Sequence, residues 1–254
     1  MVEAISNTRS EYGGNLIAEK LSALEDAHLL RTAQIIRAGG IIAFPFNGVF
    51  GLFGDWDNPA AAEAIIEAKN RPKDRKLIAV HIPERVDLYA DLACIPYLKE
   101  NIVALWRSIH ALGIILPASA QSPEGLRIVE DDQETLLTIW TEYSPLRTMM
   151  GYFQELGGRG LVGTSANKSG EPTHFDPDSL WADFYQNVQA IVVDRFDHLP
   201  KNRKKSTSII DLTNNHPRLH REGNVSKDEI REALKRHKFP ELVVGRDVIT
   251  VKGR

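Results

Sequence analysis

Residues 163–172 read GTSANKSGEP, and this stretch carries most of the information about the fold of the chain. Small and hydroxyl-bearing residues follow a short apolar run and then turn at Gly170. Such a loop can present hydroxyls and backbone N–H groups to an anion. Taken alone, the same composition is also typical of an ordinary Ser/Thr/Gly turn. The candidate binding residues in it are Thr164, Ser165 and Asn167.

A cationic stretch precedes this loop by about a hundred residues. Residues 69–76 read KNRPKDRK and directly follow a predicted helix. One interpretation is a solvated cluster that interacts favourably with the C-terminal end of the helix dipole. The other is a phosphate clamp, with Lys69 as a point charge and Arg71 as a planar fork. As solvated loop cations, both residues are expected to contribute little to stability.

A third stretch, residues 206–212, reads STSIIDL and is followed by REG at 221–223. On its own this pattern predicts only a pair of strands.

The periodicity of the remaining sequence predicts helices and strands that mix without strict βαβ alternation. Asn58-Pro59 and Ser226 with Glu229 supply clear helix starts. This mixture favours a single α/β domain with a twisted sheet of parallel and antiparallel strands and helices on its faces. Helices are expected over 24–38, 59–69, 96–110, 145–156, 179–187 and 226–237, and strands over 41–46, 77–82, 113–117, 136–140, 160–163, 190–194, 208–212 and 218–221. Residues 118–132 are expected to be a polar excursion.

Composition narrows the class of protein. The 254 residues carry 43% hydrophobic and 26% charged side chains and a net charge of −3, the balance of a soluble globular protein. That charge excludes a domain-wide basic surface for nucleic acid. The single cysteine, Cys94, cannot form an intrachain disulfide and fits a cytoplasmic location. No apolar run reaches the roughly 18 residues that cross a bilayer. Phosphate-loop, dinucleotide and metal-ligand motifs are absent from the sequence, so no protein-held metal is expected.

Taken together, the three stretches resemble the YrdC/YciO family, which includes the L-threonylcarbamoyladenylate synthases of tRNA modification. The resemblance rests on the order Lys-x-Arg-Pro-Lys, Thr-Ser-Ala-Asn-x-Ser-Gly-Glu-Pro, Ser-Thr-x-Ile-Ile-Asp-Leu and Arg-x-Gly. It runs from Leu24 to Ile230, which leaves 1–23 as an N-terminal extension and 231–254 as a C-terminal tail. It implies a YrdC-like (DHBP synthase-like) fold.

The resemblance also implies a reaction, a nucleotidyl transfer. An amine captures bicarbonate as a carbamate, the carbamate attacks the α-phosphorus of ATP, and pyrophosphate leaves. Mg²⁺ is expected to bind through the phosphates. By motif, Lys69 and Arg71 would act on the phosphates and on the developing charge. Thr164, Ser165 and Asn167 would hold the nucleotide, with Ser165 also at the acceptor. Ser206 and Arg221 would close the adenylate side.

One family motif has diverged. The family strand-turn Pro-Thr-Asp/Glu-Thr-x-Tyr-Gly-Leu, which shapes the L-threonine site, reads PFNGVFGL at residues 45–52. Phe46, Gly48 and Phe50 are therefore assigned to the acceptor site, in a pattern similar to hydrogenase-maturation carbamoyltransferases. Each unpaired polar group of threonine would lose about 1–3 kcal/mol, so weak threonine binding is expected. The alternative is that Phe46 and Phe50 point into the core and other loops supply polar contacts.

Two functions therefore remain open. The first is an enzyme that makes a carbamoyl-type adenylate from ATP, bicarbonate and threonine or another small amine. The second is a module that binds nucleotide, tRNA or double-stranded RNA without threonine-dependent turnover. The cations at 201–205 suit either function.

Overall fold

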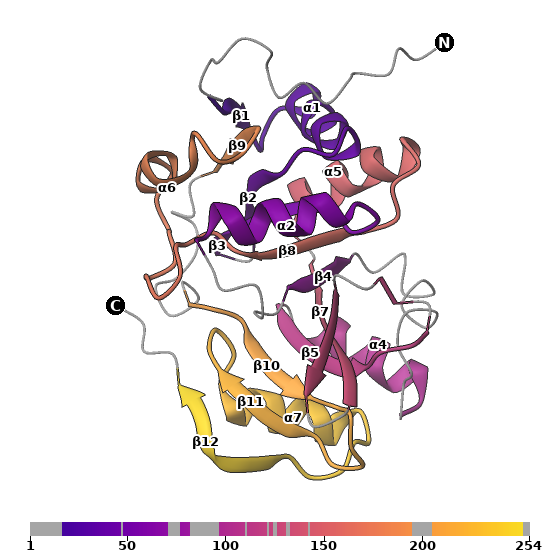
Figure 1. The fold of residues 1–254 in the computed structure, drawn as a ribbon. Helices are drawn as coiled ribbons and strands as arrows, with labels where there is room; N and C mark the ends of the chain where they lie inside the picture. Colours follow the sequence, from indigo (N-terminus) through magenta and orange to yellow (C-terminus); the bar gives the residue numbers. More distant parts are fainter. Residues whose placement is uncertain are drawn as a thin grey trace.

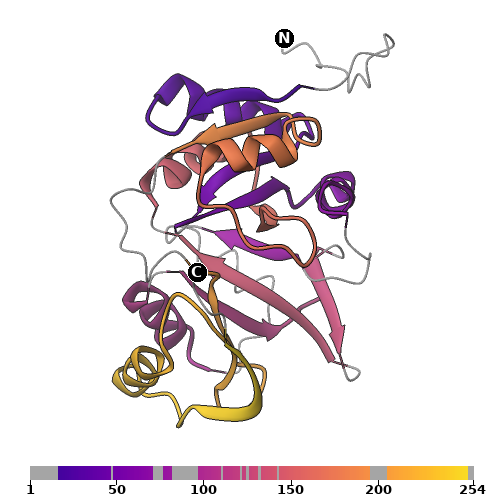
Figure 2. The same cartoon turned by 90° about the vertical axis from the view of Figure 1, so that its left-hand side faces the viewer.

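The computed structural model describes residues 17–46, 48–70, 77–81, 97–109, 111–120, 122–123, 126–130, 133–141, 143–194 and 205–250. Within these residues, strands that are far apart in the sequence join into one twisted mixed sheet with helices on its faces (Figures 1 and 2). The predicted fold class, a single α/β domain with a mixed sheet, is confirmed.

The sheet has twelve strands among the described residues, and its order differs from the sequence order. Along the sheet lie β1 (Glu19–Ser22), β9 (Ala190–Val193), β2 (Ile42–Phe46), β3 (Val49–Asp55), β8 (Leu161–Ser165), β4 (Ile78–His81), β7 (Gln133–Trp140), β5 (Leu112–Pro117), β10 (Ser208–Asp211), β11 (Arg218–Glu222) and β12 (Val243–Thr250), while β6 (Arg127–Glu130) pairs with β7 off this path.

Strands β2 and β3 form an antiparallel hairpin. Phe46 lies opposite Val49, and Gly48 between them has φ +90°, a conformation that glycine adopts without strain. Strand β9 runs parallel to β2, and β8 runs antiparallel to β3. The C-terminal ends of β9, β2 and β8 therefore meet at one edge of the sheet, beside the hairpin turn.

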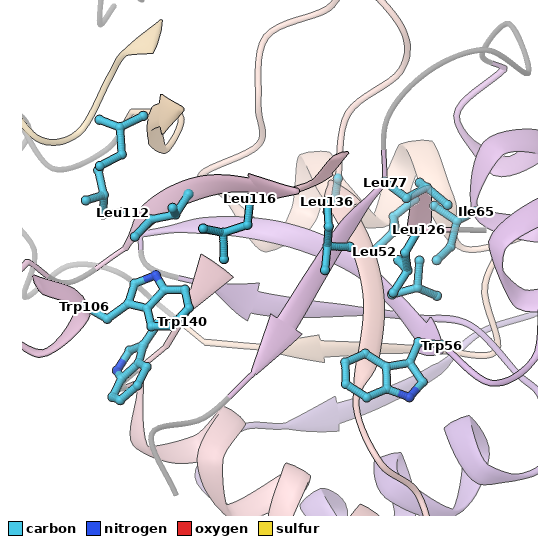
Figure 3. Close-up of a cluster of buried hydrophobic side chains, with 14 of the residues drawn as sticks. Leu52, Trp56, Ile65, Leu77, Trp106, Leu112, Leu116, Leu126, Leu136 and Trp140 are labelled. Carbon is cyan, nitrogen blue, oxygen red and sulfur yellow. The ribbon is translucent and has the colours of Figure 1, made fainter. Parts of the chain in front are cut away.

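The six described helices divide between the two faces of the sheet. Buried residues of α1 and α5 pack with Ile42, Phe44 and Val192 on one face. Residues of α2, α4, α6 and α7 contribute to one large cluster on the other face, part of which appears in Figure 3. Trp106 and Trp140 stack within it at 5.9 Å between ring centroids. The helices are α1 (Asp26–Arg37), α2 (Pro59–Ala68), α4 (Lys99–Ser108), α5 (Ser144–Glu155), α6 (Pro177–Phe184) and α7 (Lys227–Arg236).

The face of β5, β6, β7 and β10 that lies opposite α4 and α7 has a different character. Its small cluster consists of strand residues only, namely Ile115, Ile128, Leu137 and Ile209. Arg221 is paired with Ile209 across the β10–β11 ladder and so stands on this same face.

Several predicted elements need correction. Strand β1 lies inside the predicted N-terminal extension and pairs with β9, and β12 lies inside the predicted C-terminal tail and pairs with β11. Strand β3 was not predicted, because VFGLFGD is buried on both faces and shows no alternation. Strand β6 lies within the predicted polar excursion over 118–132.

Candidate active site

Lys69 ends helix α2 and is fully buried, with 0% of its surface exposed. The following Asn70 has φ +50°, the left-handed cap that commonly ends a helix. The ammonium of Lys69 donates to the carbonyl of Ser165 and, at 3.1 Å, to Oδ1 of Asn167, while Oγ of Ser165 lies 3.5 Å away. The prediction of a solvated cation at this position is wrong, because the side chain enters the protein between α2 and the end of β8.

The loop after β8 is held by Asn167, which is only 7% exposed. Its Oδ1 also accepts from the Ser165 hydroxyl at 2.7 Å. Its Nδ2 donates to the carbonyls of Lys168 and Glu171, at 3.0 and 2.7 Å. Asn167 thereby folds the loop onto itself and fixes the rotamer of the Ser165 hydroxyl. The structure brings Lys69, Ser165 and Asn167 together although about 100 residues separate them.

A backbone bond strengthens the junction between helix α2 and this loop. The N–H of Ser169 donates to the carbonyl of Lys69 at 3.2 Å. Thr164, one residue before Ser165, is buried and pairs with Leu52 on β3. Arg71, the second predicted catalytic residue, lies outside the described residues.

Ser206 and Arg221 belong to two segments that pack together at the start of β10. The Nε of Arg221 donates to the carbonyl of Thr207 at 2.8 Å. The carbonyl of Ser206 accepts from the N–H of Asn224 at 2.9 Å. A Cβ at Gly223 would lie 2.0 Å from that same carbonyl oxygen, so only glycine fits between the two segments.

Ser208 is a residue that the sequence pattern did not single out. Its buried hydroxyl donates to the carbonyl of Val225 and accepts from the N–H groups of Gly223 and Val225. The N–H of Ser208 donates to Oδ1 of Asn224 at 2.8 Å. The signal that could have revealed this network is the glycine of the Arg-x-Gly motif, which marks a close approach of two backbones.

The two groups of residues are separated in the sheet but lie on one side of the molecule. Four strand steps lead from β8 to β10, which at ~4.8 Å a step would span roughly 19 Å in a flat sheet. Figures 1 and 2 both place the loop after β8 and the start of β10 on the side that is left in Figure 1. No bond between the two groups is seen within the described residues.

Phe46 and Phe50, both predicted to lie at the acceptor site, are buried on opposite faces of the sheet. Phe50 is fully buried in the cluster beneath α2. Phe46, 6% exposed, points to the other face and packs against Phe53 with 5.6 Å between ring centroids. The aromatic rings therefore form part of the core, as in the alternative interpretation. Gly48 contributes backbone at the tip of the hairpin.

A polar pair lies close to the same edge. The hydroxyl of Tyr143 donates to the carboxylate of Asp194 at the end of β9. Burial raises the pKa of Tyr143, and the neighbouring carboxylate raises it further. Tyr143 also packs against the cluster that contains Phe46. Tyr143 and Asp194 thus add a neutral hydroxyl and a carboxylate to this edge of the sheet.

Among the described residues, no three His, Cys, Asp or Glu side chains lie together as a metal site would require. None of the helices in the described ranges has the length and apolar character to cross a membrane.

The sequence matches a family model and curated proteins over most of its length. A family model for Sua5, YciO and YrdC, described as telomere recombination, matches residues 34–223. Threonylcarbamoyl-AMP synthase of Pyrococcus abyssi is 28% identical over 230 residues, which cover 90% of this chain and 64% of that protein. The chain therefore spans less than two thirds of the length of this relative.

Solved structures support the fold. The crystal structure of P. abyssi Sua5 complexed with L-threonine has a TM-score of 0.71 at 23% identity, covering 89% of this chain and 62% of that one. The crystal structure of E. coli YciO has a TM-score of 0.67 at 16% identity, covering 84% of this chain and 98% of that one.

Proposed function

The chain belongs to the Sua5/YciO/YrdC family, and from this premise we propose that it makes a carbamoyl-type adenylate. ATP, bicarbonate and an amino acid would yield an aminoacyl-carbamoyl-AMP and pyrophosphate. The observation that carries the proposal is the contact between Lys69, Ser165 and Asn167, which joins two separate motifs into one corner. We propose that this corner binds the phosphates and refer to it as the anion-binding corner. The P. abyssi relative is named threonylcarbamoyl-AMP synthase. We infer from the resemblance in the motifs that the product serves tRNA modification and that the protein acts in the cytoplasm.

The chemistry needs positioning and positive charge more than a nucleophile. The amine of the acceptor attacks CO₂ and loses a proton, or attacks bicarbonate with loss of water, and a carbamate forms. A carbamate oxygen then attacks the α-phosphorus, and the bond to the leaving pyrophosphate breaks. Negative charge grows on the phosphate oxygens, so fixed cations and N–H donors stabilise the transition state.

Lys69 has two tasks in this proposal. In the free protein its ammonium fixes Ser165 and Asn167 from behind the loop. Because Lys69 is fully buried, a phosphate oxygen reaches its ammonium only by replacing one of these protein oxygens. The Ser165 hydroxyl, at 3.5 Å, is the most weakly held and is the one that we expect to exchange. Arg71, two residues later, would supply a bidentate contact.

Arg221 and Ser206 would bind the adenosine side of the nucleotide. The bond from Arg221 to Thr207 and the tight packing of Gly223 keep this segment rigid. Mg²⁺ prefers oxygen ligands and commonly binds through substrate phosphates and water, so we propose that ATP brings it to the site.

Release of pyrophosphate tests the proposal. Purified protein would be supplied with ATP, Mg²⁺ and ¹³C-bicarbonate, with each of a panel of amino acids in turn. Carbon-labelled adenylate together with pyrophosphate is the expected result. ATP or AMP binding in calorimetry without pyrophosphate for any amine would instead favour a nucleotide-binding module, and absence of any nucleotide binding would reject the site. Double-stranded RNA binding would be measured on the same preparation.

A further inference from the structure

A second polar network connects the loop after β8 to helix α6. Asp183, near the C-terminal end of this helix, contacts two basic side chains from the loop. Its Oδ1 lies 2.9 Å from the ammonium of Lys168, and its Oδ2 lies 2.9 Å from Nε2 of His174. Nothing in the sequence motifs assigns a role to Asp183 or His174.

His174 is itself held on both sides. Its Nδ1 lies 3.0 Å from the hydroxyl oxygen of Ser179, and that hydroxyl donates its hydrogen to the carbonyl of Asp176. Its ring meets the edge of Phe184 at 6.1 Å between centroids. The His174 side chain is 13% exposed and that of Asp183 is 24% exposed, so both lie partly out of solvent.

The chain connects this network to the anion-binding corner through a few bonds. Lys168 follows Asn167 directly, and its carbonyl accepts from the Asn167 amide. The ammonium of Lys168 is fixed by Asp183, so the backbone between Ser165 and His174 is anchored at both ends. The hydrogen bond from Lys168 and its charge, with a smaller contribution from His174, lower the pKa of Asp183 from its ordinary value.

We propose that Asp183 is a positioning residue for the nucleotide. It does not touch the reacting atoms but holds Lys168 and His174, and through them the loop that presents Ser165 and Asn167. This inference rests on the proposed nucleotide site. Charged anchors of this kind matter for catalysis because a displacement of about 1 Å at a site can reduce the rate by about 10²-fold.

The test compares Asp183→Asn with Asp178→Asn. Both remove one carboxylate from helix α6, but Asp178 is exposed in the first turn and makes no described contact with the loop. We expect Asp183→Asn to raise the Kd for AMP and the KM for ATP by about 10-fold to 10²-fold. Its melting temperature should fall by no more than about 4 °C, since a partly exposed ion pair contributes little. Asp178→Asn should match the unmodified protein in nucleotide binding.

A double-mutant cycle with Lys168→Ala provides the second readout. If Asp183 acts through Lys168, the two changes are not additive in AMP affinity. Additive losses, or a Kd unchanged in Asp183→Asn, would overturn the inference. Failure of the unmodified protein to bind AMP or ATP would instead remove the proposed nucleotide site, so the two failures are distinguishable.

Discussion

Replacement of Lys69 gives the sharpest test of the anion-binding corner. Lys69→Met keeps most of the buried stem but removes the ammonium, which donates to the Ser165 carbonyl and to Asn167. Asn167 Oδ1 retains the Ser165 hydroxyl as a donor, and the Ser165 carbonyl retains the backbone N–H of Asn167 at 3.1 Å. Neither acceptor is left unpaired, so the expected loss is that of the hydrogen bonds from a charged donor, about 1–3 kcal/mol.

The expected melting temperature follows from this magnitude. At roughly 2–4 °C per kcal/mol for a chain of this size, Lys69→Met should melt about 2–12 °C below the unmodified protein. Lys69→Ala should melt lower still, because it also leaves a cavity where the stem was. Lys235→Ala, an exposed lysine on α7, is the matched control and should change stability by less than about 0.5 kcal/mol.

Pyrophosphate release is measured on the same three variants. Both Lys69 variants should lose about 10²–10³-fold in rate, the usual effect of losing one preorganised electrostatic donor. The control should retain full activity. An unchanged melting temperature in Lys69→Met would refute the reasoning, because it would mean that the buried ammonium bonds do not form in solution. Loss of stability with full activity would make Lys69 a structural residue only.

Three further predictions address other parts of the molecule. Gly223→Ala should displace the Ser206 backbone, destabilise the protein by about 1–3 kcal/mol and weaken AMP binding in calorimetry, whereas Gly151→Ala, with open space around its Cβ, should not. Burial lowers the pKa of His237, whose Nε2 has no partner among the described residues. The neutral imidazole should therefore stabilise the fold above about pH 6.5, and this contribution should be lost as the pH falls toward the lower folded pKa. Between pH 7.5 and pH 5, the free energy of unfolding measured in urea should fall less in His237→Gln than in the unmodified protein. Because Phe46 and Phe50 are buried in the core, neither offers a polar side chain to an amino acid; L-threonine should therefore stimulate pyrophosphate release only weakly, and ordinary saturation at millimolar threonine would mean that other loops supply the polar contacts.

The sequence predicts which residues come together in the site, but it does not predict that they are buried. Motif order was sufficient to place Lys69 with Ser165 and Asn167. Whether Lys69 faces water depends on how closely α2 packs on β8, which is a tertiary property. The same limit applies to Phe46 and Phe50, because neighbouring strands decide which face of β2 and β3 is covered.

The fold could be predicted in class and in most of its helices, while four strands could not. Asn47-Gly48 is a strong hairpin signal that predicts a strand after it, yet VFGLFGD gives no periodicity to support one. Strands β1 and β12 are short or lie near the chain ends, and their partners β9 and β11 are what define them. No local pattern reveals a pairing between residues 19–22 and 190–193.

That pairing has a consequence for synthesis on the ribosome. Strands β1 and β2 are both made early, but each runs parallel to β9 and they are separated by it in the sheet. Neither can complete its backbone pairing on that side until residue 193 has left the exit tunnel. The backbone groups on one side of the apolar strand β2 therefore remain unpaired while most of the chain is translated. Such delayed, long-range closure slows folding and exposes strand edges to aggregation, so we expect the nascent chain to engage chaperones until β9 arrives.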